Sequence, residues 1–312
     1  MVPLGAGDAQ GRADVARLKQ GWRQATCQAI PDIISWDAMD LHTIETLIRL
    51  RSRSDMPEWR EGDALLAGGT WLYSEPQPSL RRLFDLTSLG WAPHEADAEG
   101  LTLGATCTVA ALERLELPPA WIAAPLVRQC CRALLGSFKV WNGATVGGNL
   151  CLALPAGPII ALTTALEGTC LLWAPDGSER RVAVPDLVLG PQLTALAPGE
   201  ILRSIHLPAG ALTRRTAFRR ISLSPHGRSG ALLIGTRGAD GAFALTITAS
   251  LPRPLRLAFP CPPDHDALLA AIEAAIPGGR YYDDVHGRPD WRRRMTDHFA
   301  GEILAELTEV RA

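Results

Sequence analysis

Two short glycine-centred loops constrain this chain more than any other feature of its sequence. The first covers residues 67–71 (Ala-Gly-Gly-Thr-Trp) and the second covers residues 145–149 (Thr-Val-Gly-Gly-Asn). Each follows an apolar run, which predicts a loop at the end of a strand-like segment. Adjacent glycines beside a threonine allow a tight turn whose backbone N–H groups point the same way, and such a concavity holds an anion. Two such loops facing each other can hold a pyrophosphate, so we expect a nucleotide cofactor between two lobes.

The composition is that of a globular protein of more than one domain. With 312 residues the chain is too long for one ordinary core, so we expect two or three domains. A net charge of −2 gives no electrostatic case for a nucleic-acid partner. Every apolar run ends before about 18 residues, so we expect no membrane span. Residues 1–26 lack a basic start followed by an apolar run, and we expect an N-terminal extension of a cytoplasmic protein.

The usual catalytic and metal-binding motifs are missing from the sequence. The seven cysteines show neither C-x2-C nor C-x4-C-x2-C spacing, and the seven histidines include no H-E-x-x-H. We therefore expect buried free thiols, no metal site and no disulfide framework. There is no G-x-G-x-x-G, P-loop or G-x-S-x-G motif either. No residue can be named as catalytic.

Hydrophobic periodicity predicts three successive blocks of structure. The first contains a helix over 40–50 capped by Asp40 and strands at 63–67 and 82–86, and the second opens near Leu101 with a strand that runs into a turn. Pro208-Ala209-Gly210 marks a boundary. Beyond it, strands precede helices, which favours a separate α+β domain. The expected elements there are strands at 217–222, 231–236 and 243–249 and helices at 267–275 and 291–307.

An arginine-rich stretch and two tryptophans each have two interpretations. Arg214, Arg215, Arg219, Arg220 and Arg228 can form a solvated face, or one of them can reach the cofactor. Trp71 follows the first glycine loop and Trp141 precedes the second. Either indole can stack on a cofactor or pack in a core.

Several runs together resemble a known family. They are Leu-Leu-Ala-Gly-Gly-Thr at 65–70, Phe-Asp-Leu at 84–86, Leu-Gly-Ala-Thr at 103–106, Asn-Gly-Ala-Thr-Val-Gly-Gly-Asn-Leu at 142–150, Leu-Pro-Ala-Gly at 154–157 and Leu-Ala-Pro-Gly-Glu-Ile-Leu at 196–202. In this order they resemble the FAD-binding (medium) subunit of molybdenum hydroxylases. That group includes carbon monoxide dehydrogenase, bacterial xanthine dehydrogenase and aldehyde oxidoreductases.

The resemblance implies an α+β architecture of two parts. Residues 27–208 would form a two-lobed FAD-binding domain of the p-cresol-methylhydroxylase type, with lobes at about 27–90 and 91–208. Residues 211–312 would form a C-terminal α+β domain like that of the carbon monoxide dehydrogenase flavoprotein. Both glycine loops would hold the FAD pyrophosphate. The implied cofactor residues are Leu66, Ala67, Gly68, Gly69, Thr70, Trp71, Thr145, Val146, Gly147, Gly148 and Asn149.

The resemblance also implies two residues near the flavin ring and shows two departures. Leu196 falls where the family has an apolar flavin contact, and Arg219 where a basic residue approaches the ring. Pro158 stands where an acidic residue is common. Pro191-Gln192 replaces a common aromatic residue. The departures concern the ring environment and leave the two loops unchanged.

The function implied is electron relay. Electrons from [2Fe–2S] clusters on a small partner subunit would pass through FAD to an external acceptor. A large partner subunit would carry molybdopterin. The three chains would form a heterotrimer, and two heterotrimers can pair into a dimer. Two alternatives stay open: a flavin-free structural subunit of such a complex, and a self-contained flavin oxidoreductase. The substrate of the complex is not legible from this sequence.

Overall fold

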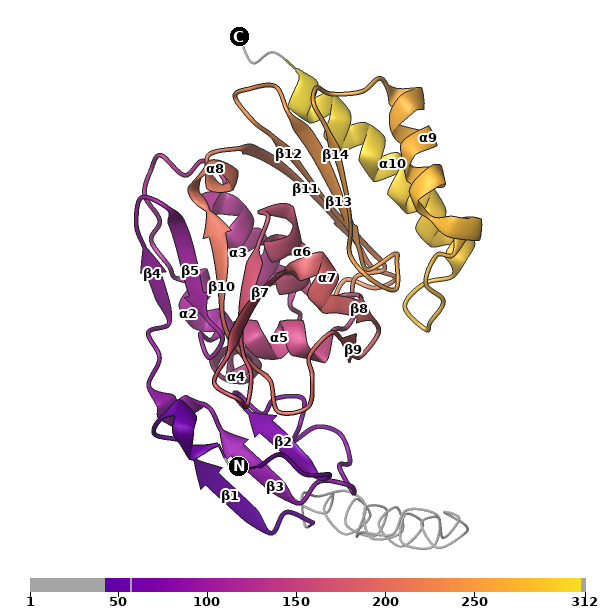
Figure 1. Cartoon of the computed structure of the whole chain (residues 1–312). Coiled ribbons are helices and arrows are strands. Elements are labelled where there is room, and N and C mark those ends of the chain that lie inside the picture. The colour runs from indigo at the N-terminus through magenta and orange to yellow at the C-terminus, as the bar shows by residue number, and fades with distance from the viewer. Residues whose placement is uncertain (1–42, 57, 310–312) are drawn as a thin grey trace, which may run out of the picture.

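The computed structural model describes residues 43–56 and 58–309. In chain order, a small parallel sheet is followed by a five-stranded antiparallel sheet with its helices, and then by a four-stranded antiparallel sheet with two long helices (Figure 1). The expected α+β fold is confirmed. Within the described ranges, no helix is both long and apolar enough to cross a membrane.

The first lobe is a three-stranded parallel sheet of order β1-β3-β2. Its strands are β1 (Thr46–Arg49), β2 (Asp63–Leu66) and β3 (Arg82–Asp85). The short 3-10 helix η2 (Arg53–Asp55) lies between β1 and β2, and η3 (Thr87–Leu89) follows β3. The helix expected over 40–50 is therefore wrong at 46–49, while Asp40 lies outside the described residues. Ile48 and Leu50 pack around Phe84 whereas Leu47 is 51% exposed. This alternation has the period of a strand, and pairing with β3 overrides the helical pattern.

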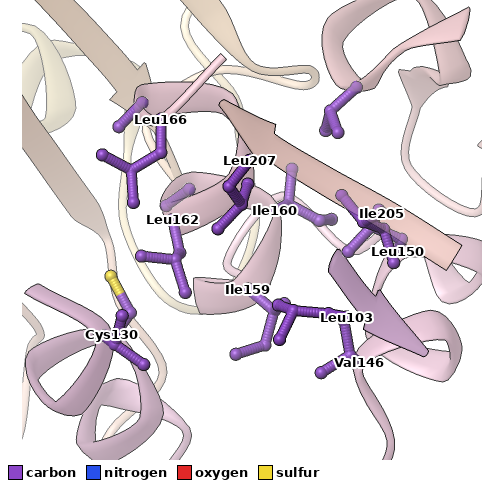
Figure 2. Close-up of a cluster of buried hydrophobic side chains, with 14 of the residues drawn as sticks. Leu103, Cys130, Val146, Leu150, Ile159, Ile160, Leu162, Leu166, Ile205 and Leu207 are labelled. Atoms are coloured by element: carbon purple, nitrogen blue, oxygen red, sulfur yellow. The ribbon is translucent and has the colours of Figure 1, made fainter. Parts of the chain in front are cut away.

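The middle lobe packs helices on one face of an antiparallel sheet of order β4-β5-β10-β6-β7. The strands are β4 (His94–Ala96), β5 (Gly100–Gly104), β6 (Thr169–Trp173), β7 (Glu179–Ala183) and β10 (Ile201–Pro208). The helices are α2 (Val109–Glu113), α3 (Ala124–Ala133), α4 (Phe138–Gly143), α5 (Val146–Leu152), α6 (Pro158–Ala165), α7 (Val184–Leu187) and α8 (Ala209–Leu212). A hairpin of β8 (Val188–Gly190) and β9 (Leu193–Thr194) precedes β10. Alternate strand residues such as Leu103 and Ile205 meet Leu150 and Ile159 in one core (Figure 2).

The C-terminal part is a sheet covered on both faces. Its strands follow the order β11 (Arg215–Ile221), β12 (Ala231–Arg237), β13 (Phe243–Thr248) and β14 (Leu255–Phe259). The helices α9 (His265–Ala275) and α10 (Pro289–Thr308), joined through η4 (Pro277–Gly279), cover one face, and α6 packs against the other (Figure 1). Every residue of β13 is consequently buried.

One carboxylate ties the C-terminal sheet to the middle lobe. Glu167, directly after α6, accepts hydrogen bonds at 2.5 Å from both Arg214 and Arg256. Arg214 precedes β11 and Arg256 lies on β14. The middle lobe and the C-terminal sheet are therefore held together by these ion pairs as well as by apolar packing.

Candidate functional site

The first glycine loop follows β2 and is pressed against the end of α4. A Cβ added to Gly68 would lie 1.6 Å from the carbonyl oxygen of Gly143, so only glycine fits. Gly69 has a φ of +67°, in the left-handed region that favours glycine, and the ring of Tyr73 lies against it. Because Gly143 lies two residues before Thr145, this contact brings the first loop to the start of the second.

The backbone N–H groups of the first loop are available to a ligand. Within the described residues, none of the N–H groups of Gly68, Gly69, Thr70 and Trp71 donates to a chain oxygen. The carbonyl of Gly69 accepts from Tyr73 and that of Trp71 accepts from Ser74, which folds the segment into a compact turn. Consecutive free donors around a left-handed glycine form a concavity suited to an anion.

The second glycine loop has a different structure from the one expected. It does not follow a strand: it follows α4, and Thr145 is the N-cap of α5, its hydroxyl accepting from the N–H of Gly148 at 3.0 Å. Val146 donates to Cys107 and Gly147 donates to Ala105. These N–H groups are used within the chain. Because its glycines have no side chains, the loop allows a ligand to approach its backbone closely. Gly147 must be glycine, since an added Cβ would lie 2.6 Å from the Cβ of Ala105.

Both loops line one cavity of about 540 Å³. Of the residues implied by the resemblance, eleven lie in its wall, and these are Leu66, Ala67, Gly68, Gly69, Thr70, Trp71, Thr145, Gly147, Gly148, Asn149 and Leu196. Val146 instead points into the core of the middle lobe (Figure 2). The rest of the wall is mostly apolar, with contributions from Leu134, Leu152 and Leu202. Its size and apolar lining suit a large ring-containing ligand.

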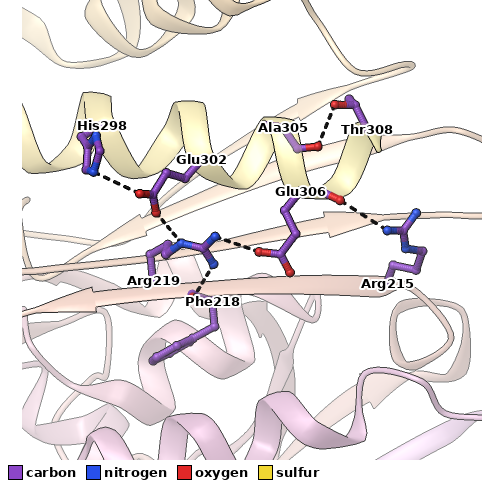
Figure 3. Close-up of polar contacts among 8 residues, drawn as sticks. All are labelled: Arg215, Phe218, Arg219, His298, Glu302, Ala305, Glu306 and Thr308. Atoms are coloured by element: carbon purple, nitrogen blue, oxygen red, sulfur yellow. Dashed lines mark hydrogen bonds and ion pairs between the residues drawn. The ribbon is translucent and has the colours of Figure 1, made fainter. Parts of the chain in front are cut away.

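Arg219 is placed on the other side of the C-terminal sheet, away from the cavity. Its guanidinium pairs with Glu302 at 2.6 Å and with Glu306 at 2.9 Å, both on α10 (Figure 3). Successive residues of β11 face opposite ways, and Phe218 packs toward the middle lobe. The hydrogen bond with Arg219 holds the pKa of Glu302 below its usual value. The structure thus gives Arg219 a structural partnership with α10.

Arg228 is the charged residue that does line the cavity, and the resemblance did not single it out. It belongs to the turn between β11 and β12, and it is the one charged side chain among the described residues of the wall. Its guanidinium carbon lies 5.8 Å from the centre of the Trp71 ring, at the first glycine loop. Arg220 braces this turn by donating to the hydroxyl of Ser229 at 2.7 Å and the carbonyl of Gly227 at 2.6 Å. The only sequence signal was its place in the arginine-rich stretch.

The two departures noted in the sequence fall in different places. Pro158 begins α6, where a residue without an N–H costs nothing, and it lines the cavity. Gln192 has a φ of +55° in the β8–β9 turn and donates its N–H to the carbonyl of Ala153.

Trp141 donates its indole N–H to the carbonyl of Leu134 and packs against the core, outside the cavity.

The chemistry of this site fits FAD. The free N–H groups of residues 68–71 and the cation of Arg228 suit a dianionic pyrophosphate, and leucine side chains suit the flavin and its tail. Glycine surfaces at both loops allow close backbone approach. The site contains the donors and the apolar volume that the dinucleotide requires.

Sequence relatives of the chain are redox proteins. Aldehyde oxidase 2 of Cavia porcellus is 26% identical over 229 residues, which cover 69% of this chain and 17% of that protein. The glyceraldehyde dehydrogenase medium chain of Sulfolobus acidocaldarius is 34% identical over 84 residues, which cover 27% of this chain and 29% of that one. The matches thus span less than a third of either relative's length.

Solved structures share the fold at low sequence identity. A reconstituted CO dehydrogenase from Oligotropha carboxidovorans matches with a TM-score of 0.72 and 22% identity, over 86% of this chain and 98% of that chain. Quinoline 2-oxidoreductase from Pseudomonas putida 86 matches with a TM-score of 0.67 and 19% identity, over 85% of this chain and 96% of that chain. The family model described as the FAD binding domain in molybdopterin dehydrogenase matches residues 41–210. With more than half of its length matched, this chain belongs to the family of FAD-binding domains of molybdopterin dehydrogenases.

Proposed function

We propose that this chain is the FAD-carrying electron-transfer subunit of a multi-subunit molybdenum hydroxylase. It would receive electrons from [2Fe–2S] clusters on a small partner subunit and pass them to an external acceptor. A large partner subunit would carry molybdopterin and the substrate site. The observation that carries the proposal is that two glycine loops, distant in sequence, line one cavity whose wall also contains the guanidinium of Arg228.

The role of the chain's own residues in this function is to bind and orient. FAD, when bound, supplies reversible electron transfer in one- and two-electron steps. The N–H groups of residues 68–71 and the guanidinium of Arg228 hold the negative charge of the dinucleotide. The leucines of the wall exclude water from its apolar part. Thr145 and Gly147 fix the facing wall through their bonds to Gly148 and Ala105.

The composition of the cavity wall favours a relay over a self-contained oxidoreductase. An enzyme that oxidises its own substrate at the flavin needs a group to take or give a proton there. The described wall residues offer Arg228, hydroxyls, one amide and a buried thiol, with no carboxylate or histidine. Chemistry on the substrate is therefore better assigned to a partner. Buried free thiols such as Cys130 and Cys131 suit the reducing cytoplasm in which we place the complex.

The absorption spectrum of the purified chain tests the cofactor assignment. We expect the two visible bands of an oxidised flavin, and about one FAD per chain released on denaturation. A colourless chain that also fails to bind added FAD would contradict the proposal and favour the flavin-free structural subunit. A chain that loads with FAD and oxidises small substrates alone would instead support the self-contained oxidoreductase.

Purification of the tagged chain from its own cells tests the partners. We expect two further chains, one with the absorption of [2Fe–2S] clusters and one containing molybdenum. Reduction of the assembled complex by its substrate should bleach the flavin bands. If the chain is isolated without partners at every salt concentration, the relay assignment is wrong.

A further inference from the structure

A second concave site lies on the open face of the five-stranded sheet, opposite the core. It has a volume of about 570 Å³. Thr102, Thr169 and His206 line it, whereas their neighbours Leu103, Cys170 and Ile205 face the core, as alternation along a strand requires. This groove shares no wall residue with the FAD cavity. It is therefore a separate feature of the middle lobe.

Arg203 is directed into the groove by an irregularity in β10. The pairing of β10 with β6 shifts register between Leu202 and Ser204, which leaves Arg203 as an extra residue. Its guanidinium carbon lies 4.5 Å from the centre of the Trp91 ring and 5.6 Å from that of Trp173. The two rings contact each other edge to face at 5.4 Å between centres. The bulge and the aromatic pair thus fix a planar cation at the groove wall.

The guanidinium of Arg203 has no polar partner in the described part of the chain. In that part it donates no hydrogen bond and forms no contact ion pair. Burial lowers its pKa, and the charge of Glu95 opposes this effect only in part. Other half-buried arginines that the structure describes do have carboxylate partners, as Arg214 and Arg256 do with Glu167. The donors of Arg203 are therefore available to a ligand that enters the groove.

The neighbouring groups include several donors suited to an oxyanion. Arg181 is a second wall guanidinium, and the hydroxyls of Thr169 and Ser204 are donors, while the hydroxyl of Thr102 shares a hydrogen bond of 3.0 Å with Nδ1 of His206. Two carboxylates also lie in the wall. Glu179 is already paired with Arg53 at 3.4 Å, and Glu95 lies on the edge strand without reaching Arg203 as an ion pair. Several hydroxyl and guanidinium donors in one groove wall suit the tetrahedral oxygens of phosphate.

We propose that this groove is a binding site for the phosphate group of a small molecule, with Arg203 as its anchor and the hydroxyls of Thr169 and Ser204 as supporting donors. The proposal does not depend on the FAD function, because the two sites share no residue. The site is nevertheless linked to the second glycine loop through Ala105, whose N–H donates to the carbonyl of Arg203 and whose carbonyl accepts from Gly147.

Calorimetric titration of the FAD-saturated chain with inorganic phosphate at low ionic strength tests the site. Saturation with FAD removes competition from the first glycine loop. We expect Arg203→Gln to weaken phosphate binding about tenfold or more, since a charge-assisted hydrogen-bond pair is lost. The matched control is Arg132→Gln, which removes one exposed arginine outside the groove and should change the affinity less than about twofold.

Two further measurements keep the test decisive. If Arg203→Gln fails to fold, Thr169→Val removes one wall hydroxyl and should weaken phosphate binding roughly threefold. Titration with succinate separates phosphate from carboxylate recognition, and we expect it to bind more weakly. Equal affinity of wild type and Arg203→Gln for phosphate would overturn the proposal, as would Arg203-dependent binding of succinate that is tighter than that of phosphate. Should FAD fail to bind, the comparison between variants still reports on the groove alone.

Discussion

Arg180 and Glu200 form a two-pronged ion pair that fixes the backbone on both sides of Leu196. Nε and a terminal nitrogen of Arg180 each donate to a carboxylate oxygen of Glu200 at 2.7 Å. The same arginine donates to the carbonyl of Ala195, and the N–H of Ala197 donates to Glu200, both at 2.7 Å. The Glu200 side chain is only 5% exposed. A residue of the cofactor wall is thus positioned by charge from outside the cavity.

Glu200→Gln should lower stability and weaken FAD binding together. The change leaves Arg180 without its counter-charge and loosens the segment that carries Leu196. We expect a loss of about 1.5 to 3 kcal/mol in the free energy of unfolding, the range for hydrogen bonds to charged groups. Chemical denaturation and FAD titration by flavin fluorescence measure the two effects. The control Glu273→Gln removes a carboxylate from an ion pair whose side chains are both more than half exposed, and should cost less than about 1 kcal/mol.

Glu200 should also make stability depend on pH in the acidic range. Its hydrogen bonds with Arg180 hold the pKa of the folded carboxyl below the ordinary value of 4.5. The stabilisation is therefore fully present above about pH 4.5 and is lost as the pH falls through the folded pKa. We expect the difference in melting temperature between wild type and Glu200→Gln to shrink as the pH is lowered below 4.5. A difference that grows on acidification would contradict this sign.

Gly68→Ala should abolish FAD binding. The added methyl would lie 1.6 Å from the carbonyl oxygen of Gly143, so the first loop has to move away from α4 and from the second loop. The expected result is a chain with near-native far-UV circular dichroism and no flavin absorbance after reconstitution. Gly210→Ala is the matched control, because an added Cβ there meets nothing within 4 Å. Normal flavin content in Gly68→Ala would show that the loops do not need this contact.

Arg228→Gln and Arg219→Gln should have separable effects. Arg228 lines the cavity, so its loss should weaken FAD binding roughly tenfold and reduce the salt dependence of that binding. Arg219 pairs with Glu302 and Glu306, so its loss should lower the melting temperature while FAD affinity stays nearly unchanged. Fluorescence titration at two salt concentrations and calorimetry provide both readouts. The opposite pattern would return the flavin contact to Arg219.

The described cysteines should differ widely in reactivity. Burial raises the pKa of Cys131 and Cys151 to about 12, so almost none of either is thiolate at neutral pH. Cys261 is exposed. Brief treatment of the native chain with iodoacetamide, followed by mass spectrometry, should therefore find Cys261 labelled before the other described cysteines. Rapid labelling of Cys151, which lines the cavity, would indicate that the cavity wall opens readily.

The elements that the sequence predicted well are those with strong local signals. The strands β12 and β13 and the helices α9 and α10 lie close to their expected bounds, because each has a run of six or more residues with one hydrophobic pattern. β1 was interpreted as part of a helix because the apolar residues of the run 40–50 are spaced as on one face of a helix. Its strand conformation comes from parallel pairing with β3, which is a long-range contact.

The sequence by itself determined that two glycine loops exist, that their surroundings are apolar, and which family they resemble, because glycine pairs and hydrophobic periods are local properties. Only the tertiary structure decided that the N–H groups of the first loop have no partner in the described ranges, whereas those of the second loop donate to Cys107, Ala105 and Thr145. It also decided that Arg228 lines the cavity and Arg219 pairs with α10. The direction of a side chain on a strand alternates with every residue, so the pairing register and the packing of neighbouring layers settle which of several arginines meets the site.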